Sequence, residues 1–129
     1  MNLLLIVLVL VGCACGSPLA GRWQGTADIG PVRAAQMILE IDEQGQTGRL
    51  QVADPGRTEA FRLCGVQRHG RSIELQYNAA RPSCEGNAGA PSELRTLKGT
   101  VGEGVVWGQI WRGNDNIGFF RAFASWIGP

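Results

Sequence analysis

The residue types that most often carry chemistry are scarce in this chain, which has 129 residues, four cysteines and one histidine. His69 stands between Arg68 and Gly70 in a turn-like segment, with no nucleophile or acid beside it. We therefore expect a solvated side chain rather than a catalytic base. With Arg71 it forms a small basic tip, which is either a plain turn or a contact for an acidic partner or lipid headgroups.

Larger catalytic or metal-binding patterns are also missing from the sequence. No Cys-x-x-Cys spacing occurs, which argues against a metal site. A serine elbow, a phosphate loop and a carboxylate pair at a defined spacing are absent too. We therefore predict that the protein is not an enzyme and has no cofactor. The twelve basic and eleven acidic residues nearly balance, so nothing indicates a nucleic-acid partner.

An apolar segment opens the chain and ends at the first cysteine. Residues 3–11 are all aliphatic, too few for a spanning helix, which needs about 20 residues, but suitable for the core of a signal peptide. The following Leu10-Val11-Gly12-Cys13 resembles the lipobox of bacterial lipoproteins. That resemblance implies cleavage before Cys13, acyl chains on that cysteine and, through Ala14, placement in the outer membrane. Secretion without a lipid and a buried N-terminal strand are the alternatives.

Export and anchoring would divide the chain into four parts. They are a signal peptide over residues 1–12, a lipidated tether over 13–21, a β-barrel domain over 22–124 and a short tail over 125–129. What remains after cleavage is long enough for a single domain with one hydrophobic core.

The other three cysteines are interpreted in the light of export. Disulfides persist in oxidising compartments, and we expect one between Cys64 and Cys84. It would close a loop of about 20 residues and stabilise the fold by on the order of 3 kcal/mol. Cys15 lies in the tether, where it is either a free thiol or pairs with another chain.

The rest of the sequence breaks into strand-like runs separated by turns rich in Gly and Asn. In residues 72–77, Ile73, Leu75 and Tyr77 alternate with polar residues, as expected of a strand with one buried face. Such runs lie near 22–29, 34–41, 48–53, 60–67, 72–77, 94–101, 105–112 and 117–124. Short turns favour hairpins, so we predict an all-β, antiparallel, up-and-down eight-stranded barrel, with a β-sandwich as the alternative.

The start of the first run also resembles a known family. Gly21-Arg22-Trp23 is similar to the Gly-x-Trp start of lipocalin-like (calycin) barrels, and the resemblance covers residues 19–124. It implies that Trp23 closes one end of the barrel by packing against Arg121, near the end of the last strand.

A ligand site is predicted from the seventh run. Trp107, Gln109 and Trp111 share one strand face, and facing inward they would either fill the barrel or line a small ligand. We therefore expect an envelope lipoprotein, lipid-anchored in the outer membrane and facing the periplasm, whose barrel binds a small apolar or amphipathic ligand. The alternative is a protein-binding module, an envelope inhibitor or assembly accessory, that acts through the long loop over residues 78–92.

Overall fold

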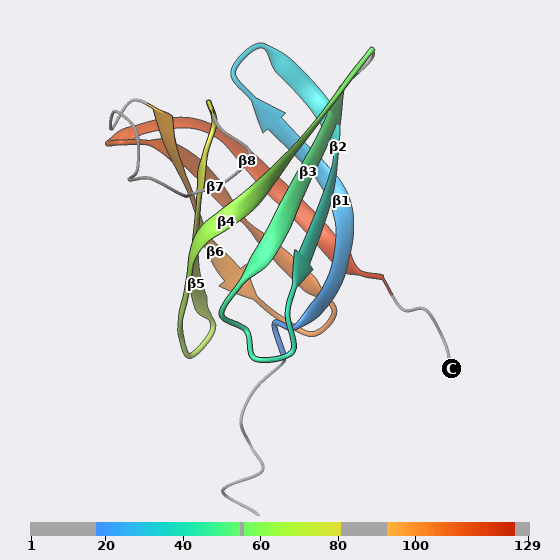
Figure 1. Ribbon diagram of the computed structural model, residues 1–129, viewed down its shortest axis with the longest axis vertical. Coiled ribbons are helices and arrows are strands. Elements are labelled where there is room, and N and C mark those ends of the chain that lie inside the picture. Colours follow the sequence, from blue (N-terminus) through green and yellow to red (C-terminus); the bar gives the residue numbers. More distant parts are fainter. Residues whose placement is uncertain (1–17, 55, 81–92, 126–129) are drawn as a thin grey trace, which may run out of the picture.

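Eight β-strands follow one another along the chain in the computed structural model, which describes residues 18–54, 56–80 and 93–125 (Figure 1). Their bounds lie within three residues of the predicted ones. The strands are β1 (Gly21–Ile29), β2 (Val32–Ile41), β3 (Gly48–Asp54), β4 (Arg57–His69), β5 (Ser72–Asn78), β6 (Leu94–Val101), β7 (Val105–Arg112) and β8 (Asp115–Ala124).

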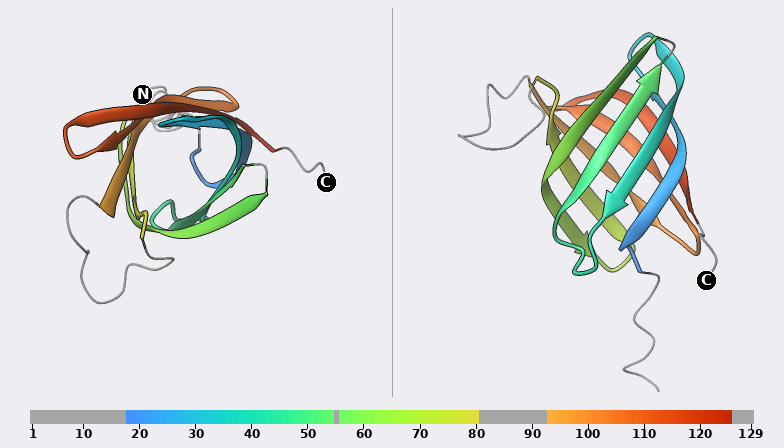
Figure 2. Two further views of the ribbon diagram at one scale, coloured as in Figure 1. Left: turned by 90° about the horizontal axis from the view of Figure 1, so that it is seen from above. Right: turned by 45° about the vertical axis from the view of Figure 1, so that its right-hand side comes forward.

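These strands close into a barrel. Each pairs antiparallel with the next along the chain, and β8 pairs back onto β1, with Thr26 opposite Arg121. Seen from above, the ribbons form a ring of tilted strands (Figure 2). The predicted up-and-down barrel is confirmed, and the sandwich alternative is wrong because closure leaves no second sheet. Closure also pairs the backbone groups that an edge strand would expose.

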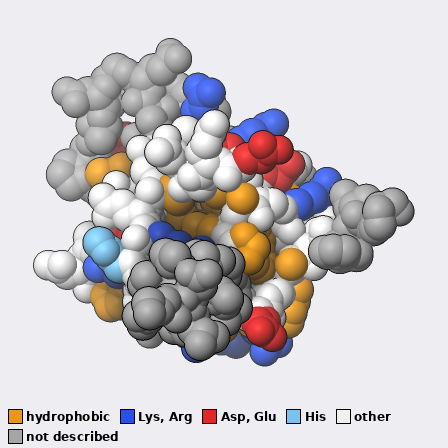
Figure 3. Space-filling model, turned by 90° about the horizontal axis from the view of Figure 1, so that it is seen from below, with side chains coloured by type: hydrophobic (Ala, Val, Ile, Leu, Met, Phe, Trp, Pro, Cys, Tyr) orange, Lys and Arg blue, Asp and Glu red, His pale blue; other side chains and the backbone are white. Residues whose placement is uncertain are grey.

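The barrel has two distinct ends. The upper end carries the β1–β2, β3–β4 and β7–β8 turns (Figure 1). The lower end carries the other short turns and the start of β1, and hydrogen bonds tie these turns together. Val101 N donates to Arg71 O at 2.8 Å, and Ala124 N donates to Gly104 O at 2.9 Å. From below, hydrophobic side chains occupy the middle of this end and charged ones lie around it (Figure 3).

Period-two alternation puts one face of every strand into a single core. Leu39, Leu75, Val106 and Ala122 have no exposed surface at all. The core continues around the whole ring through residues of all eight strands, among them Ala27, Met37, Leu50, Leu63, Ile73, Leu97, Val101 and Ile110. Removing this apolar surface from water is the main stabilising contribution to such a fold.

Paired glycines allow the backbones of β6 and β7 to approach each other closely. Gly99 lies opposite Gly108 in the register of the two strands. A Cβ atom on Gly108 would collide with the Lys98 carbonyl oxygen, and the ring of Phe120 covers the inner side of Gly99. Glycine is therefore required at both positions. Glycines within strands commonly mark places where another backbone approaches closely.

Cys64 lies at a β-bulge in β4. Leu63 lies opposite Tyr77, but Gly65 lies opposite Gln76, so β4 has one extra residue at this point. Cys64 follows the inward-facing Leu63 and is exposed on the outer wall. Its predicted partner Cys84 lies outside the described residues, as do Cys13 and Cys15, so the disulfide and the lipidation stay predictions.

Candidate functional site

Trp23 is buried at the lower end of the barrel. It is only 3% exposed, and its indole Nε1 donates a hydrogen bond of 2.9 Å to the carbonyl oxygen of Leu19, itself 4% exposed. This position is compatible with the predicted role of Trp23 in closing one end, which stays a prediction. Leu19, just before β1, packs with Trp23 in the core. Its carbonyl oxygen accepts the hydrogen bond of the indole N–H, the only polar group of the Trp23 side chain.

The predicted partner of Trp23 is wrong. Arg121 points outward, and its guanidinium carbon lies 5.6 Å from the centre of the Phe123 ring on the same outer face. In β8 the inward positions belong to Phe120 and Ala122, which are buried, so Arg121 between them must face solvent. Trp23 lies opposite Ala124 in the β1–β8 register.

The predicted inward orientation of Trp107, Gln109 and Trp111 is also wrong. Trp107 is 41% exposed, Gln109 is exposed, and Trp111 is half-buried with Lys98 Nζ 5.6 Å from its ring centre. The neighbouring positions face inward instead, with Val106 and Ile110 almost completely buried. Trp107 lies opposite the outward-facing Arg121 in the β7–β8 register, so it points to the same outer side.

Among the described residues, several apolar side chains at the upper end of the barrel are only half-buried. Four half-buried apolar side chains pack there against the core, from four different segments of the chain: Ile29, Val52, Ala79 and Ile117. This contrasts with the lower end, where Leu19 and Trp23 are buried. The upper end of the barrel therefore has an apolar rim.

An aromatic pair lies just inside this rim. The rings of Phe61 and Tyr77 are 4.9 Å apart and tilted by 41°. Burial raises the pKa of Tyr77 to about 12, while the positive charge of Arg95 acts to lower this pKa and the negative charge of Glu59 acts to raise it. Both charges therefore lie near enough to act on the phenol, although neither is its hydrogen-bond partner in the described contacts.

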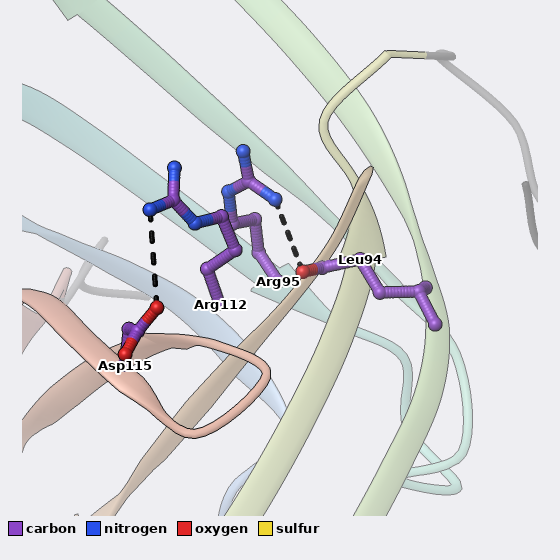
Figure 4. Close-up of polar contacts among 4 residues, drawn as sticks. All are labelled: Leu94, Arg95, Arg112 and Asp115. Carbon is purple, nitrogen blue, oxygen red and sulfur yellow. Dashed lines mark hydrogen bonds and ion pairs between the residues drawn. The ribbon is translucent and has the colours of Figure 1, made fainter. Parts of the chain in front are cut away.

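Two arginines stand beside each other above this pair, at the upper ends of β6 and β7. Thr96 lies opposite Trp111 in the register, which makes Arg95 and Arg112 neighbours one residue further along. Figure 4 shows their side chains extending in the same direction. Arg95 Nη1 donates to Leu94 O at 3.1 Å, and Arg112 Nη2 lies 4.0 Å from an Asp115 carboxylate oxygen, a long and exposed ion pair.

We call Phe61, Tyr77, Arg95 and Arg112 the upper mouth. Two adjacent guanidinium groups over an apolar rim can hold a carboxylate or phosphate through paired N–H donors. Arg57, at the start of β4, forms an ion pair of 2.6 Å with Glu59. The upper mouth thus combines positive charge with apolar surface.

A hollow lies on the outer wall, where β1, β7 and β8 meet. It is a groove of about 490 Å³. Trp107, Phe119 and Arg121 line it together with Thr26, Asp28, Gly108 and Phe120. Trp107 therefore does line a hollow, but on the outside of the barrel.

The remaining predicted features give no further chemistry. His69 is exposed at the lower end, and Arg68 Nε donates to Gly70 O at 2.7 Å to hold the adjoining turn. Among the described residues, no group of histidine, cysteine and carboxylate side chains is placed to hold a metal ion. The same part of the chain has no helix long and apolar enough to cross a membrane. Residues 81–92 of the predicted functional loop lie outside it.

Comparisons with protein-family models, with curated proteins and with solved structures find no match to this chain. The class of the protein therefore follows from the fold alone. It is a closed, eight-stranded antiparallel barrel, compatible with the lipocalin-like type that its first strand resembles.

Sequence reasoning missed both arginines of the upper mouth and the exposed phenylalanines of β8. A signal for Arg95 did exist, because it stands two residues before the inward-facing Leu97 and so shares its face. For Phe119 and Phe123 the signal is Arg121, which stands between them on the same strand face and marks that face as the outer one.

Proposed function

We propose that this protein is an exported bacterial lipoprotein, anchored through acyl chains on Cys13 in the outer membrane and facing the periplasm, whose barrel binds a small amphipathic ligand. The binding site is the upper mouth. Arg95 and Arg112 hold an anionic head group, and the apolar part of the ligand lies against the rim above Phe61 and Tyr77.

One observation carries this proposal: the two ends of the barrel differ. At the lower end Leu19 and Trp23 are buried, while half-buried apolar side chains lie at the upper end, where Arg95 and Arg112 are neighbours. Apolar walls with a few convergent polar groups are the usual composition of small-molecule sites. An anion that contacts both Arg95 and Arg112 would accept charge-assisted hydrogen bonds from the two guanidinium groups, in addition to the long ion pair of Arg112 with Asp115.

Binding of alkyl chains with different head groups tests the site. We expect a medium-chain alkyl carboxylate to bind in calorimetry, and the alkyl alcohol of the same length to bind about ten- to a hundredfold more weakly, because it lacks a charge-assisted hydrogen bond. The variants Arg95→Gln and Arg112→Gln should each remove most of this preference.

The matched control is Arg49→Gln, which changes an exposed arginine on the outer wall of β3. It should bind the carboxylate as the unchanged protein does. Equal binding of the two ligands, or no binding of either, would contradict the proposed site.

Anchoring is tested separately by the mass of the protein isolated from membranes. A chain that begins at Cys13 and carries acyl groups supports the proposal. A mass equal to that of an unmodified chain, cleaved or not, contradicts it. This result does not depend on whether any ligand binds.

A further inference from the structure

Three large hydrophobic side chains are exposed among the described residues, and all three lie on one part of the outer wall. Trp107 is 41% exposed, Phe119 57% and Phe123 51%. In the β7–β8 register Trp107 lies opposite Arg121, which stands between the two phenylalanines along β8. We call these four residues the aromatic face. A cluster of this kind on a soluble wall usually marks an interaction surface.

The barrel interior does not need these rings. Phe120 and Ala122 of β8 and Val106 of β7 already fill the inward positions. The carboxylate of Asp28 lies beside the face. It accepts a hydrogen bond of 2.6 Å from Ala34 N and so binds the backbone of β2. Arg121 is left as the cation of the face, in contact with the Phe123 ring.

Aromatic rings beside an arginine suit a lipid surface. The rings enter the boundary between headgroups and acyl chains, and the guanidinium group remains at the level of the phosphates. Trp107 and Phe119 line a groove, so the face is hollowed as well as apolar.

The start of the described chain lies at the lower edge of this face. Ser125 N, two residues after Phe123, donates to Arg22 O at 2.7 Å. Pro18 lines a pocket together with Arg22, Ala124 and Ser125. Pro18 is the fifth residue after Cys13, and a fully extended chain of five residues spans only about 18 Å. An acyl anchor on Cys13 therefore keeps the lower edge of the face near the bilayer.

We propose that the aromatic face docks on the surface of the bilayer to which the protein is anchored. This inference rests on the proposed anchor at Cys13, and it adds an orientation: the wall formed by β7 and β8 lies on the lipid. The upper mouth is then held beside the membrane, where amphipathic molecules are concentrated.

Fluorescence quenching by brominated lipids tests the orientation. The protein isolated from membranes is placed in vesicles of zwitterionic and anionic phospholipids, with or without bromine on the acyl chains. The contribution of Trp107 is the difference between the unchanged protein and the variant Trp107→Phe. We expect brominated chains to remove the larger part of that contribution. The double variant Phe119→Ser/Phe123→Ser should lose this quenching, whereas Gln36→Ser/Gln51→Ser, on the exposed faces of β2 and β3, should keep it.

Vesicle flotation separates the two proposals. A protein that floats with the vesicles but shows no quenching of Trp107 overturns the docking face and leaves the anchor intact. One that does not float overturns the anchor and this inference with it. If Trp107 is not quenched and the double phenylalanine variant turns a dimer into a monomer in light scattering, the face joins two copies of the chain instead.

Discussion

The indole nitrogen of Trp23 donates a hydrogen bond to the carbonyl oxygen of Leu19, four residues earlier, and both side chains are buried at the lower end of the barrel. The segment before β1 thereby becomes part of the core. A single contact joins Trp23 to the segment that leads back toward the proposed anchor.

Trp23→Phe should destabilise the fold by about 1–3 kcal/mol. The smaller ring leaves a gap in the core, and the Leu19 carbonyl loses its donor in a buried position. Urea unfolding measures the change in the free energy of unfolding. Trp107→Phe is the matched control, because Trp107 is exposed, and it should change this free energy by less than about 0.5 kcal/mol. Equal effects of the two substitutions would contradict this account of the lower end.

Gly108→Ala should destabilise the barrel by more than about 2 kcal/mol, because the new methyl group meets backbone atoms of β6 that cannot move without breaking the sheet. Gly65→Ala is the control. A Cβ there would find only Gln76 Oε1 within 4 Å, at 3.7 Å, so the cost should be small. Thermal unfolding of the two variants compares them directly. If Gly108→Ala proves as stable as Gly65→Ala, the close approach of β6 and β7 is not required.

Alkaline pH should unfold the protein through Tyr77, the only tyrosine in the chain. Its pKa is about 12 in the folded state and about 10 in an unfolded chain. Below pH 10 the phenol is neutral in both states, so stability is unaffected. As pH rises from 10 to 12 only the unfolded state loses the proton, and stability falls by about 1.4 kcal/mol per pH unit.

The ultraviolet absorbance of tyrosinate follows this ionisation without interference from another tyrosine. The absorbance should rise well above pH 10 and together with unfolding, not before it. The variant Tyr77→Phe should lose less stability over the same pH range. A phenol that titrates near pH 10 in the folded protein would contradict the burial of Tyr77.

The disulfide predicted between Cys64 and Cys84 is tested by alkylation of the cysteines. Without reduction, neither residue should be modified. After reduction, both should gain the alkyl group, which peptide mass mapping shows. Exposure of Cys64 on the outer wall means that a free thiol there would react readily. Modification of Cys64 before reduction would therefore disprove the bridge.

The strands of this barrel could be predicted from the sequence because the signals are local. Alternation such as Ile73, Leu75 and Tyr77 identifies a strand with one buried face, and Gly or Asn at each turn indicates a hairpin. Eight such strands in succession have few ways to protect their edges, so the closed barrel also followed from the sequence. The burial of Trp23 followed from its place in the first strand.

Which face of β7 points inward was decided only by the tertiary structure. In β7, Trp107 and Trp111 compete with Val106 and Ile110 for the core, and large apolar side chains stand on both faces, although Gln109 shares the face of the two indoles. Strand pairing decides the orientation, because residues opposite each other in a sheet point to the same side. Phe120 and Ala122 of β8 are buried, so Arg121 between them faces outward, and Trp107, opposite Arg121 in the register, faces outward with it.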